Sequence, residues 1–534
     1  MESVRRESAL KHLSVWLVCV LLVACTTPKP TNTPTPLPTA TAFPTPTPKP
    51  TAAGAATAYL NAWQSGDYAA MYALLAPESQ SAMSQADFEK HYRENLSIMA
   101  ATGVTAQVTG STDGADTAQV QAHVVFSTLI VGSVETDINL EVKRVGGVWR
   151  VLYSPTLIWP ELVNGQRLYM APLTADRATI YDRNGAPMVK LTDAYAIGLV
   201  PSQIVDPAAV ETGLGRLLGV PSETIHAKYE FAIPDQYLSL AEVAAEDVDN
   251  SRFRYLFGVS GIQWSPYTSR FYYGNGGAAH VTGYISYIQP EELDAYRAKG
   301  YAGDERVGKA GLEAWGEATL AGKPGGQLMV VDANGNVVRR ITAAAQPVPG
   351  QDVYATVDFG LQREVQLALE GTAGAAVVLN LHTGEVLALA SSPTFDPNLF
   401  DVQNVNSMAL AQVVNDYGLP LFNRATRLQK PAGSVFKVVT MAAAMTSGLF
   451  TPETTYECTG EWNEVGLAAP LTDWKEGGHG LLTLQEGLTA SCNPWFWHIG
   501  NALYQYDPAY LSQTARAFGL GAPTGLAQLG EEAG

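Results

Sequence analysis

The spacing of apolar residues near the start of the folded part of the chain predicts three helices. Apolar residues recur at helical intervals over residues 55–63 and 68–75, and the second of these runs is expected to stop at Pro77. A third helix is predicted to begin at Ser84, because Ser-x-x-Asp before an apolar pattern is similar to a capping box.

A different pattern follows, in which apolar and polar residues alternate as they do in half-buried strands. Strands are predicted over residues 118–126, 137–145 and 148–153, and Gly146-Gly147 favours a tight turn between the last two. Helices followed by a curved antiparallel sheet predict an α+β cone, which we place at residues 53–160.

Residues 161–350 have a mixed and irregular pattern, and we treat them as a separate linker domain. The next domain is placed at residues 351–534. Asp358 is expected to cap a helix over residues 361–369. Two apolar runs then flank His382-Thr383-Gly384, which predicts a hairpin with strands over residues 375–381 and 386–391. Because both strands are apolar on both faces, we expect helices to cover this sheet.

Another apolar run begins at Val435 and has no helix breaker before Gly448. It is apolar on every face, which predicts a helix buried behind the hairpin sheet. Ser434 at its start and Lys437 one turn later would lie on the same side. An ammonium in apolar surroundings has a lowered pKa and can act as a base, while a hydroxyl at a helix N-terminus has backbone N–H groups nearby. The simpler interpretation is a capping serine beside a lysine that reaches solvent.

A second polar motif, Ser491-Cys492-Asn493, lies between two predicted helices. Thr483 and Glu486 form a capping box for the first helix, and Pro494 suits the first turn of the next. The motif therefore falls in a loop, where its side chains can point toward a cleft. The alternative is that Ser491 and Asn493 only cap helices.

These motifs, with Gly478-His479-Gly480 between them, resemble the transpeptidase domain of penicillin-binding proteins, whose motifs are Ser-x-x-Lys, Ser-x-Asn and Lys-Thr/Ser-Gly. The resemblance implies that Ser434 is the nucleophile and Lys437 its base. It also implies that Ser491 relays a proton to the leaving amine, and that Asn493 binds the amide carbonyl of the substrate. The expected substrate-binding residues are Gly433, Cys492 and His479, although His479 also fits a turn-shaping role.

The implied reaction is a two-step acyl transfer. The nucleophile attacks the D-Ala–D-Ala bond of a peptidoglycan stem peptide, D-Ala leaves, and the amine of a neighbouring strand accepts the acyl group. A β-lactam would acylate the same serine. The resemblance implies no metal and no organic cofactor. Its implied partners are stem peptides, β-lactams and a membrane, together with a cell-wall synthesis complex or a second copy of the chain.

Two other stretches extend the resemblance. Residues 147–151 and 158–160 are similar to the end of the N-terminal domain of methicillin-resistance-type penicillin-binding proteins, which has a nuclear-transport-factor-like fold. Residues 178–185 resemble the start of the dimerisation or linker domain of class B members. The expected fold class is therefore α+β and multidomain. It comprises a nuclear-transport-factor-like cone, a mixed linker domain and an incomplete transpeptidase domain of the serine β-lactamase-like α/β sandwich type.

The first 52 residues predict a membrane tether. Basic residues precede an apolar run over residues 13–25, which ends in Leu22-Val23-Ala24-Cys25. This ending resembles a bacterial lipobox, so Cys25 is the expected lipidation residue and residues 1–25 the signal peptide. An uncleaved signal anchor is the alternative. Residues 26–52 are rich in Thr and Pro and, at about 3.1 Å per residue, predict an extended spacer reaching roughly 80 Å. The rest of the chain is expected outside the cytoplasm, attached to the cell membrane.

Composition narrows the functional classes. The chain has 33 basic and 51 acidic residues, and its net charge of −18 argues against nucleic acid as a partner. Of the four cysteines, only Cys458 and Cys492 lie beyond the leader. A disulfide between them and two buried free thiols are both compatible with the sequence.

The third motif is missing, since neither Lys-Thr-Gly nor Lys-Ser-Gly occurs in the 534 residues. We expect the chain to be a fragment of a longer reading frame, with a short and inactive relative as the alternative. The leading functional prediction is a D,D-transpeptidase that binds penicillin covalently. Its rivals are a D,D-carboxypeptidase, in which water replaces the acceptor amine, and a scaffold or β-lactam sensor.

Overall fold

The structure is a computed structural model that describes residues 51–249, 252–526 and 529–534. The predicted signal peptide with Cys25, and nearly all of the Thr/Pro-rich spacer, lie outside the described residues. No helix within the described ranges combines the length and the apolar character needed to cross a membrane.

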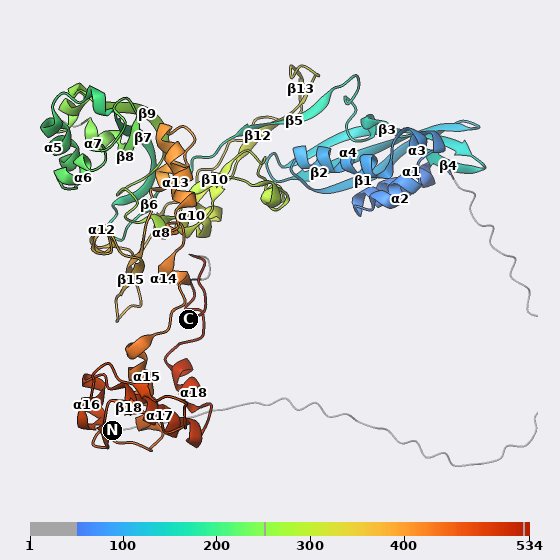
Figure 1. Cartoon of the computed structure of the whole chain (residues 1–534). Coiled ribbons are helices and arrows are strands. Elements are labelled where there is room, and N and C mark those ends of the chain that lie inside the picture. The colour runs from blue at the N-terminus through green and yellow to red at the C-terminus, as the bar shows by residue number, and fades with distance from the viewer. Residues whose placement is uncertain (1–50, 250–251, 527–528) are drawn as a thin grey trace, which may run out of the picture. The chain divides into compact units, whose positions relative to one another are not determined.

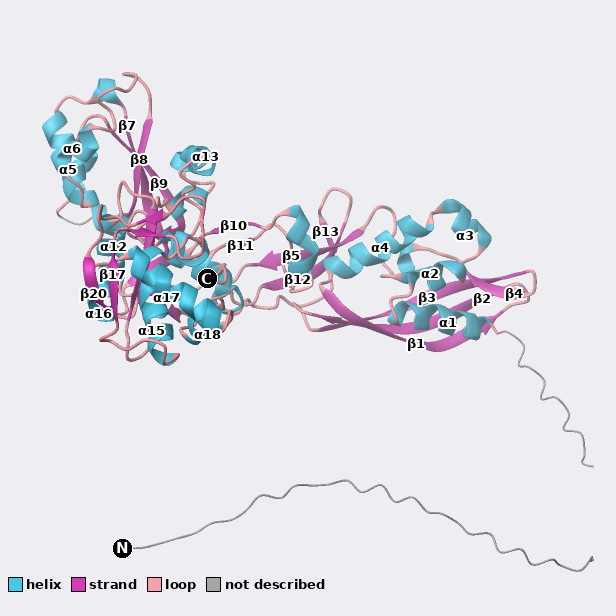
Figure 2. Ribbon diagram, turned by 60° about the horizontal axis from the view of Figure 1, so that its bottom comes forward, coloured by secondary structure: helices cyan, strands magenta, loops and turns pink. Residues whose placement is uncertain are grey.

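The N-terminal domain places helices against one antiparallel sheet. Strands β1 to β4 pair in chain order, and α1 lies along this sheet (Figure 2). Its interior is filled by aromatic side chains, among which Trp63 packs edge-on against Tyr92 and Phe126. The elements are α1 (Ala52–Gln64), α2 (Tyr68–Ala73), α3 (Pro77–Ala82), α4 (Gln85–Ile98), β1 (Ala101–Asp113), β2 (Thr117–Thr128), β3 (Ser133–Val145) and β4 (Val148–Val151).

The predicted helices and strands of this domain are present, and two details differ. Helix α2 already ends at Ala73, and Pro77 begins α3, because the N–H that proline lacks is one that the first turn of a helix leaves unused. Strand β1 is absent from the prediction. Its residues Val104, Ala106 and Val108 alternate with polar residues and are partly buried against the core, but this alternation covers only five of the 13 residues of the strand.

Two sheets organise the middle of the chain (Figure 1). In the first, β12 (Gly325–Val331) pairs with β5 (Arg167–Leu173) and β13 (Val337–Arg340). In the second, the long strand β7 pairs with β6, β8 and β9, and β14 lies parallel to β6. The strands of the second sheet are β6 (Ile180–Tyr181), β7 (Pro187–Leu199), β8 (Leu238–Ala244), β9 (Ile262–Tyr272) and β14 (Val353–Tyr354). The remaining elements are α5 (Pro207–Leu218), α6 (Ser222–His226), α7 (Ala245–Val248), α8 (Ala279–Thr282), β10 (Ile285–Tyr287), α9 (Leu293–Arg297), β11 (Arg306–Gly308), α10 (Gly311–Trp315) and α11 (Glu317–Leu320).

A buried ion cluster fastens these middle elements together. The side chain of Glu313 on α10 is fully buried, and it pairs with Arg270 of β9 and with Arg177. The Arg177 Nη2 atom lies 2.7 Å from Glu313 Oε2. Since a buried charge is costly unless it is paired, this carboxylate ties three separated segments into one unit.

The C-terminal part begins as predicted. Asp358 accepts a hydrogen bond from Leu361 N–H at 3.0 Å and caps α12 (Phe359–Ala368). Strands β15 (Gly374–Leu379) and β16 (Val386–Ser392) form the predicted hairpin. The expectation that helices cover it fully is wrong within the described residues. Strand β16 is largely buried, whereas Val377 and Leu379 of β15 are about half exposed, because α12 packs chiefly against β16.

A separate core forms around the predicted nucleophile helix. After α13 (Leu410–Asn415) and α14 (Arg424–Arg427), a 3₁₀ turn over Gly433–Phe436 leads into α15 (Lys437–Thr446). Helix α15 packs against α17 and α18 (Figure 1), and α17 contributes Trp495, Phe496, Ile499 and Leu503 to the buried residues of this core. The other elements are β17 (Thr455–Cys458), β18 (Glu461–Trp462), β19 (Leu471–Thr472), β20 (Gly480–Thr483), α16 (Leu484–Thr489), α17 (Asn493–Tyr506) and α18 (Tyr510–Ala517).

Two expectations about this helix need correction. It is not buried on every face, because Val438 is 52% exposed and Met445 is 43% exposed. Its buried residues Ala443 and Ala444 belong to the core formed with α17, whereas Leu389 of β16 belongs to a different core. The apolar sequence therefore identifies a helix, but it does not identify which elements that helix packs against.

Candidate active site

The predicted nucleophile lies in the 3₁₀ turn that precedes α15. Gly433 has a φ of +59°, a left-handed conformation that suits glycine, and it turns the chain into the helix. Ser434 is exposed, whereas Lys437 begins α15 and is only 8% exposed. The hydroxyl of Ser434 is thus open to solvent, whereas the nearby amine of Lys437 is buried.

The second motif lies in the loop between α16 and α17, as predicted. The capping box is present: Thr483 N–H donates to Glu486 Oε2 at 2.9 Å, and Glu486 N–H donates to Thr483 Oγ1 at 3.3 Å. Ser491 has a φ of +53°, which is uncommon for a residue with a side chain. Asn493 is the first residue of α17.

The two motifs meet at the amine of Lys437. Lys437 Nζ donates to Ser491 O at 2.7 Å, to Ser491 Oγ at 3.0 Å and to Asn493 Oδ1 at 2.7 Å. Ser491 Oγ lies 3.1 Å from Ser434 Oγ. The four residues predicted to be catalytic are therefore joined in one hydrogen-bonded chain, in which the hydroxyl of Ser491 connects the amine to the hydroxyl of Ser434.

Burial lowers the pKa of Lys437, and the negative charge of Asp473 partly offsets this effect. The amine also lies 5.5 Å from the centre of the Phe496 ring. A lysine with a lowered pKa and three oxygen neighbours is suited to exchanging protons with a hydroxyl. This arrangement is able to activate a serine.

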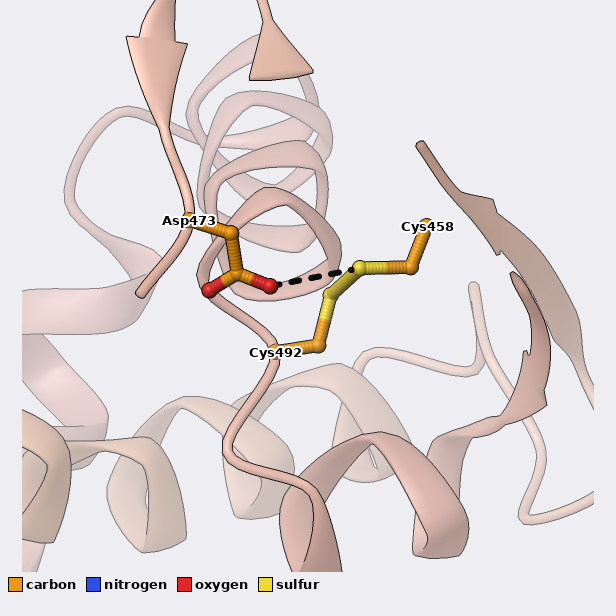
Figure 3. Close-up of side chains that lie close together, drawn as sticks. All are labelled: Cys458, Asp473 and Cys492. Atoms are coloured by element: carbon orange, nitrogen blue, oxygen red, sulfur yellow. Dashed lines mark hydrogen bonds between the residues drawn. A yellow bond between two sulfur atoms is a disulfide. The ribbon is translucent and has the colours of Figure 1, made fainter. Parts of the chain in front are cut away.

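Behind the Ser491–Asn493 loop lies a buried polar cluster that the sequence did not reveal. Asp473 has a fully buried side chain, and its Oδ1 atom accepts Asn493 N–H at 3.1 Å. His479 Nε2 lies 3.3 Å from Asp473 Oδ2, a contact that falls short of a hydrogen bond. Cys458 and Cys492 form a disulfide beside the carboxylate (Figure 3). Of the two alternatives for these cysteines, the structure therefore has the disulfide and not the two free thiols. Asp473 lies in an irregular segment after a two-residue strand, where no spacing pattern points to it.

The same cluster contains the residue types that bind metals. Within the described part of the chain, Cys458, Asp473 and Cys492 form a group whose potential ligand atoms lie within 4.8 Å of one another. Cysteine binds metals as a thiolate, and a disulfide has no thiolate.

The three predicted substrate-binding residues have different surroundings. Gly433 is exposed and adjoins Ser434. The side chain of Cys492 is fully buried in the disulfide, so only its backbone is available for substrate. The side chain of His479 is 9% exposed and packs against Trp474, with ring centres 5.2 Å apart. This position agrees better with the turn-shaping alternative, and contact with substrate stays a prediction for all three.

Comparison with known families accounts for the three folded regions in order. Residues 51–166 match the NTF2-like N-terminal transpeptidase domain, residues 172–355 the penicillin-binding protein dimerisation domain, and residues 374–534 the penicillin-binding protein transpeptidase domain. The chain belongs to the class B penicillin-binding proteins. The family and the expected fold class are therefore confirmed, while the exact domain boundaries stay predictions.

Several relatives of this penicillin-binding protein are named peptidoglycan D,D-transpeptidase MrdA. The protein from Salmonella typhimurium strain SL1344 is 32% identical over 376 residues, which cover 69% of this chain and 59% of the relative. The Escherichia coli K12 protein is 31% identical, covering 69% of this chain and 58% of the relative. Penicillin-binding protein 3 of Bacillus subtilis is 26% identical over 476 residues, covering 86% of this chain and 67% of the relative. The chain thus spans less than two thirds of the length of the MrdA relatives.

A solved complex between PBP2 and MreC from Helicobacter pylori aligns to this penicillin-binding protein with a TM-score of 0.46. It is 25% identical and covers 67% of this chain and 66% of the solved chain. A score this low adds nothing to the assignment of fold or function.

Proposed function

We propose that this protein is a peptidoglycan D,D-transpeptidase that works through an acyl intermediate on Ser434 and binds penicillin covalently. The observation that carries the proposal is the hydrogen-bonded chain from Lys437 Nζ to Ser491 Oγ at 3.0 Å, and from Ser491 Oγ to Ser434 Oγ at 3.1 Å. Matches to the transpeptidase domain, and the names of the MrdA relatives, favour this function over the carboxypeptidase, sensor and scaffold alternatives.

The oxygens around Lys437 suggest how the base acts. Ser491 O and Asn493 Oδ1 are carbonyl oxygens that can only accept hydrogen bonds. A neutral amine has two hydrogens and one lone pair, so these two oxygens occupy the hydrogens. The lone pair is left facing the Ser491 hydroxyl, which is the third neighbour. In this state Ser491 donates to Lys437 and accepts from Ser434.

The proposed reaction follows from this geometry. Ser434 Oγ attacks the carbonyl carbon of the D-Ala–D-Ala bond as its proton passes through Ser491 to Lys437. The peptide C–N bond breaks, and the same path returns the proton to the departing D-Ala amine. In the second step, the amine of a neighbouring stem peptide attacks the acyl ester, loses a proton along the path and releases Ser434. Asn493 would orient the amide of the substrate.

No residue of this sequence is assigned to the substrate carboxylate, because Lys-Thr-Gly and Lys-Ser-Gly do not occur in the 534 residues. The proposed substrates are stem peptides and β-lactams. Attachment to the membrane through a lipid on Cys25 is a further part of the proposal, supported by Leu22-Val23-Ala24-Cys25 alone. Substitution of Cys25 by serine should move the protein from the membrane fraction to the soluble fraction if that part is right.

Labelling with a fluorescent penicillin tests the proposed activity. We expect a covalent band with the wild-type chain and none with Ser434→Ala. Ser447→Ala is the matched control: this serine follows the other end of α15, and its hydroxyl donates to Ala444 O and accepts Leu449 N–H, so its loss should leave labelling intact. Equal labelling of wild type and Ser434→Ala would show that another residue is acylated and would refute the assignment.

A further inference from the structure

One aromatic ring lies against the amine at the centre of the active site. Lys437 Nζ lies over the ring of Phe496, 5.5 Å from the ring centre. Phe496 is 5% exposed and belongs to the core that α17 forms with α15. The face of an aromatic ring carries partial negative charge, and it attracts an ammonium that lies within about 6 Å of the ring centre. The amine of Lys437 is therefore within reach of this attraction whenever it is protonated.

The spacing of two residues on α17 explains why the ring lies there. Asn493 is the first residue of this helix, and Phe496 follows three positions later, so the two side chains are neighbours on one side of the helix. Asn493 Oδ1 accepts a hydrogen bond from Lys437 Nζ at 2.7 Å. The first turn of α17 thus brings both an oxygen and a ring to the same amine.

The ring contributes something that the oxygens around the amine do not. Lys437 Nζ makes hydrogen bonds with Ser491 O at 2.7 Å, with Ser491 Oγ at 3.0 Å and with Asn493 Oδ1 at 2.7 Å. Together with the bond to Cε, these contacts account for every bonding direction of the nitrogen. The ring therefore acts on the charge of the amine and not through a hydrogen bond. Its attraction is strong for the protonated amine and weak for the neutral one.

We propose that Phe496 is a positioning residue of the active site, whose ring stabilises the ammonium that forms on Lys437 during acylation. In the proposed reaction the O–H bond of Ser434 breaks, the proton passes through Ser491, and a new N–H bond forms on Lys437. The electron pair left on Ser434 Oγ forms the bond to the carbonyl carbon of the substrate. The amine is charged only after this transfer, so the ring stabilises that state more than the resting enzyme. This role in catalysis rests on the proposed transpeptidase function.

Exclusion of water is the competing explanation for a buried ring at this position. Burial lowers the pKa of Lys437, and any apolar side chain in place of Phe496 would have the same effect. The two explanations predict different results when the charge on the ring face is reduced. Loss of a cation partner lowers the pKa of Lys437 further, whereas a ring that only excludes water leaves that pKa unchanged.

The other charges near the amine stay in place during this comparison. The negative charge of Asp473 raises the pKa of Lys437 and opposes the effect of burial. Helices α16, α17 and α18 pack against α15, and their residues that can be charged near neutral pH are Glu486, His498 and Arg516. In the described structure none of these three makes a hydrogen bond or ion pair with the amine. A change confined to the ring of Phe496 therefore reports the contact between ring and amine.

Graded fluorination of the ring separates the two explanations in the full chain. Replacement of Phe496 by para-fluorophenylalanine, and then by a trifluorinated phenylalanine, withdraws electron density from the ring face while the size and apolar character of the side chain change little. We expect the rate of penicillin acylation to fall stepwise, by about three- to tenfold in total, which is the range of a cation–π contact. The pH below which acylation slows should also move downward with each step, while the binding constant for penicillin changes little.

Phe450 provides the matched control. It belongs to the same buried core and packs edge-on against Trp495, with ring centres 5.6 Å apart. Fluorination of Phe450 should leave the acylation rate and its pH dependence unchanged. If the trifluorinated ring at Phe496 acylates as fast as wild type, or if the pH dependence moves upward, the ring does not stabilise the ammonium and the proposal is wrong. A loss that falls on penicillin binding would contradict it as well.

A measurement that needs no turnover distinguishes this proposal from the proposed function. If the wild-type chain takes up no penicillin, the proposed function fails. Competitive acetylation of Lys437 over a series of pH values, read by mass spectrometry, then still gives the pKa of its amine. A pKa that falls with each fluorine on Phe496 supports the contact between ring and ammonium. A pKa that stays constant or rises overturns it.

Discussion

Ser491 Oγ lies 3.1 Å from Ser434 Oγ. The sequence-based expectation was direct proton transfer from the nucleophile to Lys437, with Ser491 serving only the leaving amine. In the structure the Ser491 hydroxyl joins the nucleophile to the amine, so one residue can serve both half-reactions. Ser491 is therefore expected to matter for formation of the acyl intermediate as well as for its release.

Removal of the Ser491 hydroxyl should slow acylation by β-lactams. We expect Ser491→Ala to lose about 10²–10⁴-fold in acylation rate, the range for loss of a group that transfers protons. Ser491→Gly should lose as much, although glycine accepts a φ of +53° without strain. Stopped-flow acylation of both variants makes the comparison. If Ser491→Gly acylates as fast as wild type, the hydroxyl is not on the proton path.

The pH dependence of the acylation rate should report the protonation state of Lys437. The base is active when neutral, so the rate should fall as the pH drops through the pKa of Lys437. Because burial lowers that pKa, this acid limb should lie below the ordinary lysine value of about 10.4. Asp473→Asn removes the charge that partly offsets the effect, and it should move the limb to lower pH. Acylation rates between pH 5 and 10 test this, and a limb that moves upward in Asp473→Asn would contradict the electrostatic assignment.

Loss of the buried carboxylate of Glu313 should destabilise the dimerisation domain. Glu313→Ala leaves Arg177 and Arg270 without their shared partner, and breaking a buried ion pair typically costs about 3–5 kcal/mol. Denaturation by urea should therefore begin at lower concentration. Glu78→Ala removes the partner of Lys143 at an exposed pair, where water screens the charges, and should cost much less. Similar effects of both substitutions would show that the buried cluster is not a special source of stability.

Glu242 should make the contact between the dimerisation and transpeptidase domains sensitive to pH. Burial and the charge of Asp396 raise the pKa of Glu242 to about 8 in the folded protein, from 4.5 when free. The folded state therefore prefers the protonated acid. The stability that this preference provides is fully present below about pH 4.5, and it is lost as the pH rises toward 8.

Glu242→Gln tests that prediction because it resembles the protonated acid. Its amide oxygen can accept Asn406 Nδ2–H, which now lies 2.7 Å from Glu242 Oε1, and its amide nitrogen can donate to the Tyr267 hydroxyl. We expect the melting temperature of Glu242→Gln to vary less between pH 5 and 8 than that of wild type. If the melting temperature of Glu242→Gln changes with pH as much as that of wild type, the pH dependence comes from other groups.

Local motifs were predictable from sequence because the residues that define them are close together. Ser434 and Lys437 are one turn apart, and the capping box of Thr483 and Glu486 spans four positions, so each is complete within a short stretch. Helix and strand types in the N-terminal domain followed from periodicity for the same reason, except in β1, where the alternation is confined to residues 104–108.

Contacts between distant segments were not predictable in this way. Asp473 accepts the Asn493 N–H across 20 positions, through a loop without periodic pattern, and this contact follows only from the fold. The apolar sequence of β15 and α15 could not distinguish surfaces buried in the described structure from exposed ones such as Val377 and Val438. The sequence identified the residues of the proposed reaction, whereas the structure identified the contacts that position them.

Peptide mapping of the penicillin adduct tests the central claim most directly. Trypsin should release residues 428–437, a peptide in which Ser434 is the sole hydroxyl side chain. The account predicts that the mass of the opened β-lactam is found on this peptide, and that it disappears in Ser434→Ala. An adduct on any other peptide of the folded chain, or no adduct at all, would contradict the assignment of Ser434 as the nucleophile of this protein.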